Sequence, residues 1–219
     1  MHDPDAFSCA LTVSGGGAHG AFAVGAIDYL VNVAGKSFDV FSGTSTGALI
    51  TPLVATGDID TLLHIYQSVQ TTDILSARPA INALTLQDAV NSAEPLYTLI
   101  REAYTEERCR EILANHRIHF ATVNLASGHT VIFHTGAHAP YHTQTNSSGV
   151  RRSLTYLPLR DRNSLIGAIK ASTAIPIFMP PSQIDTEEAP CVVPSYHPGG
   201  EDCIIKPSDW YVDGGVREV

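Results

Sequence analysis

The spacing of apolar residues in the first part of the chain predicts two strands that are each followed by a helix. Short apolar runs at 9–14 and 37–42 are typical of buried strands, whereas residues 18–33 and 48–55 carry apolar side chains at helical spacing. Glycine-containing turns separate each strand from its helix. Two strand–turn–helix units in succession indicate a parallel sheet, so we expect an α/β fold.

The rest of the chain adds both helices and strands. Residues 58–115 are expected to be mostly helical, and residues 163–172 to form a further helix. Residues 118–124 and 130–134 are strand-like and flank a Ser-Gly pair, which predicts a hairpin. A last short strand is expected at 210–212.

Two polar segments interrupt this pattern. Residues 135–160 are rich in His, Ser, Asn and Gly, and residues 180–202 hold many of the prolines, so we interpret both as loops. Residues 74–90 are apolar with few charges, which fits a flap over an apolar site as well as it fits a core helix. We expect residues 1–219 to form a single domain.

The net charge limits the classes of binding partner, and the cysteine content indicates the redox compartment. A formal net charge of −9 disfavours nucleic-acid binding and electrostatic docking onto anionic lipid, so any membrane contact should be local and apolar. The four scattered cysteines form no Cys-x-x-Cys pair, which predicts free thiols in a reducing compartment. Since no signal peptide or membrane-spanning run is visible, we expect a cytoplasmic location.

The segment from Gly43 to Gly47 has the pattern Gly-x-Ser-x-Gly, with Ser45 at its centre, between a predicted strand and a predicted helix. Glycine on both sides relieves the crowding of a serine on a sharp turn. Such a turn exposes the Ser45 hydroxyl and directs the Thr46 N–H toward a substrate oxygen at a helix N-terminus. Ser45 is therefore a candidate nucleophile.

The segment from Gly15 to Gly20 also follows a strand and opens a helix. Its Gly-x-Gly-x-x-Gly pattern is typical of dinucleotide-binding sites as well as of loops that present backbone amides to an anion. A dinucleotide site would place an acid at the end of the second strand, but Asp39 lies inside that strand. We therefore expect Gly15, Gly16 and Gly17 to face an oxyanion, and keep a nucleotide-binding α/β domain as an alternative.

Asp213 ends the last predicted strand and precedes two glycines, which indicates a carboxylate on a tight turn. No histidine follows it in the sequence, so a Ser-His-Asp triad would need an earlier pair, such as Asp161 or Asp185 with His197. None of these follows a readable strand. A carboxylate that acts directly on the serine fits the motifs better, and a Ser-His-Asp esterase is the second alternative.

Several histidines fall close together, and His134, His138 and His142 are spaced by four residues. A metal site would need such imidazoles to converge, for example on one helix face. Gly136 and Pro140 disfavour a helix there, so we predict a solvated loop and no metal site.

Three glycine-containing motifs occur in the order seen in patatin-like phospholipases: the Gly15–Gly20 segment, the serine turn, and Asp213 followed by Gly214 and Gly215. The segment 171–181 also resembles that family's segment before its catalytic acid. The resemblance runs over most of the chain. It implies a three-layer α/β/α sandwich with a mostly parallel central sheet.

The resemblance also implies roles for individual residues. Ser45 would attack a fatty-acyl ester to form an acyl-enzyme, with Asp213 as its base. The amides of Gly15–Gly17 and Thr46 would form the oxyanion hole. It implies no cofactor, and as partner a lipid or other fatty-acyl ester, presented on a membrane or micelle surface.

Two positions depart from the family pattern. Family members usually carry Arg or Lys where this chain has His19, so a contribution from that side chain would depend on pH. Family domains also continue past the acid, whereas this sequence ends at Val219, so we expect a C-terminally truncated domain with Asp213 near a fraying end.

Overall fold

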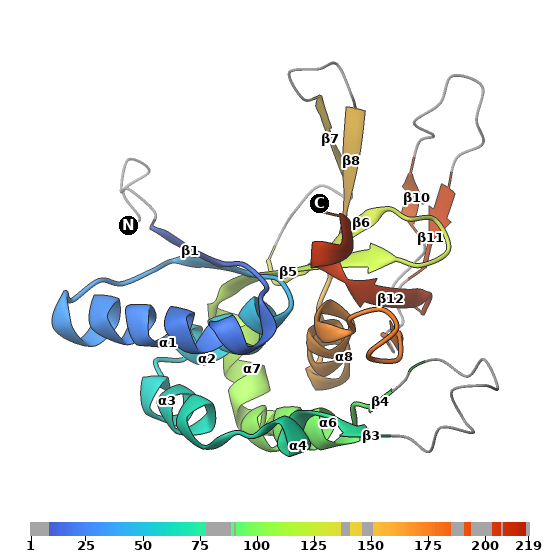
Figure 1. The fold of residues 1–219 in the computed structure, drawn as a ribbon. Coiled ribbons are helices and arrows are strands. Elements are labelled where there is room, and N and C mark those ends of the chain that lie inside the picture. Colours follow the sequence, from blue (N-terminus) through green and yellow to red (C-terminus); the bar gives the residue numbers. More distant parts are fainter. Residues whose placement is uncertain are drawn as a thin grey trace, which may run out of the picture.

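A mixed β-sheet is the centre of the molecule (Figure 1). The computed structural model describes residues 9–77, 89, 91–136, 141–145, 151–184, 191–193, 203–206 and 208–217. The sheet has the order β1-β2-β5-β6-β8-β7, with β12 on β5 and β9 on β12. Its strands are β1 (Ala10–Val13), β2 (Val40–Gly43), β5 (Arg117–Asn124), β6 (Thr130–His134), β7 (Tyr141–Thr145), β8 (Arg151–Pro158), β9 (Ser182–Gln183) and β12 (Trp210–Asp213).

Parallel pairing aligns the ends of the first two strands. β1 pairs in parallel with β2, and Val13 lies opposite Gly43 in the register. β2 in turn pairs in parallel with β5, where Gly43 lies opposite Phe120. Because both strands end at the same edge, the glycine-rich segment and the serine turn begin side by side.

Antiparallel pairing brings the last strand to the same place. β12 runs antiparallel to β5, with Asp213 opposite Thr122. Thr122 lies two residues beyond Phe120, the partner of Gly43. The register therefore delivers Asp213 beside the turn that follows Gly43.

The helices follow the order that the apolar spacing predicts. The 18–33 helix consists of a 3-10 turn, an α-helix and a π-helical turn, and the 48–55 helix begins slightly earlier, at Thr46. Helices α3, α4, α6 and α7 confirm the helical prediction over the described part of 58–115. The bounds are η1 (Gly17–His19), α1 (Gly20–Asp28), η2 (Tyr29–Val33), α2 (Thr46–Ala55), α3 (Ile59–Ser68), α4 (Thr71–Ile74), α6 (Glu94–Ala103), α7 (Glu106–Asn115), α8 (Arg162–Thr173) and η3 (Gly214–Arg217).

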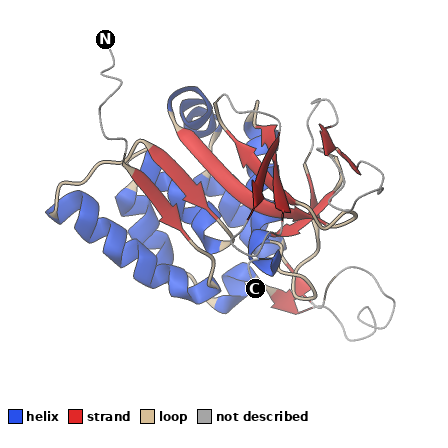
Figure 2. Ribbon diagram, turned by 90° about the horizontal axis from the view of Figure 1, so that it is seen from above, coloured by secondary structure: helices blue, strands red, loops and turns tan. Residues whose placement is uncertain are grey.

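The core lies between the sheet and these helices. Figure 1 shows the helices below the sheet, and Figure 2, seen from above, shows the strands in front of them. Along β1, Leu11 and Val13 are buried while Ala10 and Thr12 are exposed. The predicted α/β fold is therefore confirmed, with a mixed central sheet and helices packed against it.

Two loop predictions are wrong in part. Within 135–160, β7 and β8 form an antiparallel pair at the sheet edge. An edge pair can carry many polar residues, because part of its surface faces solvent, and this composition concealed the strands. Within 180–202, β9 and β10 (Cys191–Val193) are short strands, and β10 pairs with β11 (Cys203–Ile205).

The flap prediction falls largely outside the described residues. Of residues 74–90, Ile74 ends α4, and Ser76–Ala77 form β3, which pairs with β4 (Asn91–Ser92). Residues 78–88 and 90 are not described. No helix in the described ranges combines the length and apolar character needed to cross a bilayer.

Candidate active site

The turn that carries Ser45 is held by close backbone packing. Ser45 has φ 55° and ψ −124°, a conformation that is costly for a residue with a side chain. A Cβ on Gly47 would lie 2.0 Å from the Val13 carbonyl oxygen, and one on Gly43 would lie 2.4 Å from the Gly47 oxygen. Both positions therefore require glycine, as the motif predicts.

Hydrogen bonds fix Ser45 at the start of α2. Its N–H donates to the Ser172 hydroxyl at 3.1 Å, and its carbonyl accepts from the Ala48 N–H at 2.9 Å. The side chain is only 6% exposed, so the hydroxyl lies in a sheltered position rather than in bulk solvent.

Asp213 lies at the end of β12 and is 5% exposed. Its N–H donates to the Ala174 carbonyl at 3.0 Å, and its carboxylate accepts the Gly215 N–H at 2.8 Å. Burial raises the pKa of this carboxyl, although hydrogen bonds from the Ser45 hydroxyl and the Gly215 amide act in the opposite direction. The two residues singled out in the sequence thus lie close enough for Ser45 to affect the pKa of Asp213.

The glycine-rich segment lies against the serine turn. A Cβ on Gly15 would lie 2.8 Å from the Ser45 Cβ. Gly16 and Gly17 have φ values of 154° and 54°, which favour glycine. The Thr46 hydroxyl donates to the Gly17 carbonyl at 3.0 Å and so ties the segment to the start of α2.

The remaining motif glycines also sit where a side chain would collide. A Cβ on Gly20 would lie 2.1 Å from the Thr46 Cγ2, and one on Gly214 would lie 2.5 Å from the Ala121 oxygen. One on Gly215 would lie 3.2 Å from the Asp213 carboxylate. The structure therefore brings all the predicted site residues into one region.

A cavity of about 420 Å³ opens beside Ser45, Gly17 and Thr46. Most of its lining is aliphatic and comes from α2, α3, α4 and α6. The aliphatic lining includes Leu49, Leu53, Leu62, Ile65, Leu96 and Ile100. An apolar cavity of this kind suits a hydrocarbon chain rather than a charged ligand.

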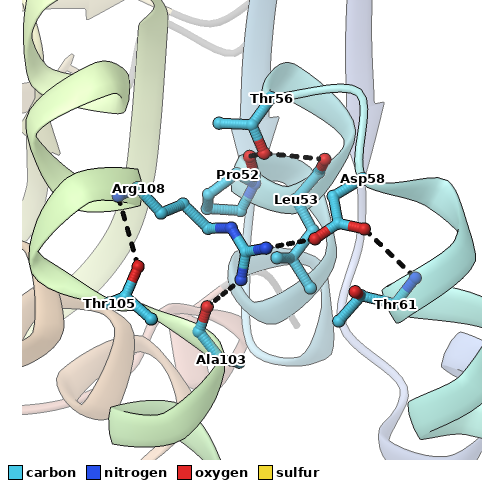
Figure 3. Close-up of polar contacts among 8 residues, drawn as sticks. All are labelled: Pro52, Leu53, Thr56, Asp58, Thr61, Ala103, Thr105 and Arg108. Atoms are coloured by element: carbon cyan, nitrogen blue, oxygen red, sulfur yellow. Dashed lines mark hydrogen bonds and ion pairs between the residues drawn. The ribbon is translucent and has the colours of Figure 1, made fainter.

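An ion pair ties together the helices that form the cavity wall (Figure 3). Arg108 of α7 donates to the Asp58 carboxylate and to the Ala103 carbonyl. Asp58 also caps α3 by accepting the Thr61 N–H at 3.2 Å. The turn between α2 and α3 is thereby joined to the turn between α6 and α7, a contact that the sequence pattern does not reveal.

The competing predictions find less support in the geometry. Asp161 accepts the Ser164 N–H at 2.7 Å and caps the start of α8, at the opposite end of that helix from Ser172. Asp185 and His197 lie outside the described residues. The Asp161 carboxylate is therefore engaged as a helix cap rather than directed at Ser45.

The structure also weakens the nucleotide-binding alternative. Asp39 accepts the Cys9 N–H at 3.0 Å, at the start of β1. The glycine-rich segment lies at the other end of that strand. Asp39 thus precedes the start of β2, and no acid stands at the end of that strand, where a ribose site would require one.

The structure also shows where two of the histidines considered in the sequence lie. His19 is exposed and lies beside Gly16, where a Cβ would be 3.3 Å from the His19 Cβ. His134 is buried on β6 and stacks on His119, with ring centroids 6.2 Å apart. Over the described ranges, no group of three metal-ligating side chains comes together.

Comparison with known proteins places this geometry in a family. The sequence model described as patatin-like phospholipase matches residues 11–219. A comparison with curated proteins finds no match. The matched range includes the glycine-rich segment, the serine turn and Asp213.

Proposed function

Because the chain belongs to the patatin-like phospholipase family, a family of lipid acyl hydrolases, we propose that it cleaves fatty-acyl esters with Ser45 as nucleophile and Asp213 as base. One observation carries the proposal: Ser45 and Asp213 are both buried, and the Ser45 side chain lies close enough to the Asp213 carboxylate to lower its pKa, beside an apolar cavity. This proximity supports a carboxylate that acts on the serine without an intervening histidine.

The proposed reaction has two stages. Asp213 accepts the Ser45 proton as the hydroxyl oxygen attacks the ester carbonyl carbon, and the protonated carboxyl then donates to the leaving alcohol oxygen. The Ser45 ester is hydrolysed in the second stage by a water molecule that Asp213 deprotonates. The fatty acid leaves, and the serine proton is restored.

The glycine-rich segment would stabilise the charge that develops on the carbonyl oxygen. Gly15 packs against Ser45, Gly17 lines the same cavity as Ser45, and Thr46 begins α2. Donors that are already oriented before the reaction stabilise an oxyanion without reorganisation. The neighbouring cavity would hold the acyl chain, since its lining is largely aliphatic.

An exposed apolar turn at this cavity supports contact with a lipid surface. Ile175 and Met179 line the cavity, and the Met179 N–H donates to the Ile175 carbonyl at 2.8 Å. Between them, Ile177 and Phe178 are 73% and 56% exposed, and Ile177 has a strained φ of 74°. With a net charge of −9, such a turn suits zwitterionic lipid better than anionic lipid.

Phe178→Ser tests this contact. Binding to phosphatidylcholine vesicles should weaken, while hydrolysis of a dissolved short-chain ester should be unchanged. Ile204→Ser is the matched control, because Ile204 is also 56% exposed but lies on β11. Equal vesicle binding by all three proteins would contradict the proposed contact.

Ester hydrolysis tests the proposed function itself. The protein would be given a dissolved short-chain ester and phosphatidylcholine in mixed micelles, and the released acid would be measured. Ser45→Ala should abolish release and Asp213→Asn should lower its rate by at least about 100-fold, whereas replacing any single histidine should do neither. Activity that survives Ser45→Ala would contradict the proposal.

A Ser-His-Asp esterase and a nucleotide-binding domain, the two alternative functions, each predict a different experimental result. An essential histidine would favour a Ser-His-Asp esterase. Thermal stabilisation by NAD or ATP would favour a nucleotide-binding domain.

A further inference from the structure

The C-terminal end of α8 contacts both members of the proposed dyad. Ser172 is fully buried there and accepts the Ser45 N–H at 3.1 Å. Two residues later, the Ala174 carbonyl accepts the Asp213 N–H at 3.0 Å. Thr173, between them, lines the cavity. Three consecutive residues therefore touch the nucleophile, the cavity and the base.

A second hydrogen bond fixes the direction of the Ser172 hydroxyl. This group donates to the Ala121 carbonyl on β5 at 2.7 Å. A hydroxyl has one proton, so donation to Ala121 leaves a lone pair to accept the Ser45 N–H. Ala121 precedes Thr122, the register partner of Asp213. The serine turn, α8 and β5 are thus joined by one buried side chain.

The backbone conformation of Ser45 explains why such a contact matters. A serine with φ 55° is strained, and strain of this kind persists only where surrounding contacts hold it. The bond to Ser172 holds the N–H of Ser45 itself. It also engages that amide, so within the serine turn the Thr46 N–H, rather than the Ser45 N–H, would face an oxyanion.

We propose that Ser172 is a positioning residue that holds Ser45 in the geometry needed to reach both Asp213 and the ester carbon. This inference rests on the proposed acyl hydrolase function. It gives a role to a segment that the sequence singled out without one. It predicts that losing the hydroxyl slows the chemical step more than it weakens substrate binding.

Ser172→Ala tests the inference through a split between kcat and KM. With a dissolved short-chain ester, kcat should fall on the order of 10-fold to 100-fold, because a small displacement of a reacting group is costly. KM should change by less than about threefold, because Ser172 does not line the cavity. Assays would be run well below the unfolding midpoint of each protein.

Two further variants separate positioning from folding. Ser164→Ala is the matched control, because Ser164 is also fully buried on α8 and donates to the Asp161 carbonyl at 2.9 Å. It should lower the melting temperature and leave kcat unchanged. Ser172→Cys nearly preserves the volume but hydrogen-bonds weakly, so its kcat should fall even if Ser172→Ala does not fold.

The outcomes distinguish this inference from the function on which it rests. Wild-type hydrolysis that persists in Ser45→Ala would overturn both. Hydrolysis that depends on Ser45 but proceeds at the wild-type kcat in the Ser172 variants would overturn the positioning role alone. An equal loss of kcat in Ser164→Ala would also overturn it, because the effect would then be a general one of α8.

Discussion

The serine turn and the glycine-rich segment meet at one site, yet they need glycine for different reasons. At the serine turn, a Cβ on Gly47 would lie 2.0 Å from a backbone oxygen of β1. In the glycine-rich segment, a Cβ on Gly17 would meet nothing within 4 Å, but φ is 54°. Packing therefore requires glycine at the first position, and backbone conformation requires it at the second.

Because of this difference, substitutions at the two positions should affect different properties of the protein, namely its folding stability and its catalytic rate. A side chain at the serine turn would displace β1 and α2, which belong to the core. A side chain at Gly17 would strain one residue of an exposed segment and shift the amides near Ser45. We expect the first change to affect folding and the second mainly to affect catalysis.

Gly47→Ala should have the largest effect. Only backbone movement can relieve the contact with the Val13 oxygen, so we expect a loss of about 3 kcal/mol or more in the free energy of unfolding. Denaturant melts would measure it. Gly25→Ala is the control, because a Cβ there meets nothing within 4 Å and α1 should gain slightly. Equal stability of the two variants would contradict the conclusion that packing requires glycine at position 47.

Asp213→Asn should have the largest effect on activity without loss of the fold. Without a base, kcat/KM should fall on the order of 10²-fold to 10⁴-fold. Burial raises the pKa of Asp213, so the ionised group destabilises the fold at neutral pH, and the amide removes that cost. Melting temperatures should therefore be equal or higher. A large loss of stability at neutral pH would show that the carboxylate is needed for folding.

Gly17→Ala should have an intermediate effect on activity. The left-handed φ should cost about 1 kcal/mol, and displaced amides should lower kcat by up to about 100-fold. Gly128→Ala is the matched control, because its φ is 67° and a Cβ there also meets nothing within 4 Å. The two variants should lose similar stability, but only Gly17→Ala should lose activity. Equal activities would contradict a role for the segment in catalysis.

The pH dependence of the wild-type protein should show the smallest effect. Asp213 acts as a base only when ionised, and its pKa is raised above the usual 3.8. The acid limb of kcat/KM should therefore lie at a higher pH than an ordinary aspartate gives. Stability from this group is present at low pH and is lost as pH rises from its unfolded to its folded pKa. An acid limb at or below the usual value would argue against burial of the working base.

Much of the site could be predicted because its parts follow strands. Val13 and Gly43 end neighbouring parallel strands, so motifs that directly follow them must meet at one edge of the sheet. The spacing of Gly43 and Gly47 around Ser45 also allowed the close packing of the serine turn to be predicted. The proximity of Asp213 to Ser45 was harder to predict, because it depends on the antiparallel register of β12 on β5.

Contacts between distant residues could not be read from local patterns. Ser172 and Ser45 are 127 residues apart, and a serine inside a helix carries no signal that its hydroxyl binds another turn. The Arg108–Asp58 pair is hidden for the same reason. The strands β7 and β8 were missed because their polar composition is also typical of a loop. Whether such a segment forms a strand depends on its pairing partners, which the composition does not reveal.

Reaction with a fluorophosphonate probe, followed by mass spectrometric mapping, shows directly whether Ser45 is the nucleophile and Asp213 its base. We expect an adduct at Ser45, no adduct at that position in Ser45→Ala, and much slower labelling in Asp213→Asn. Labelling at another residue, or labelling of Ser45 at the same rate without the Asp213 carboxylate, would contradict it.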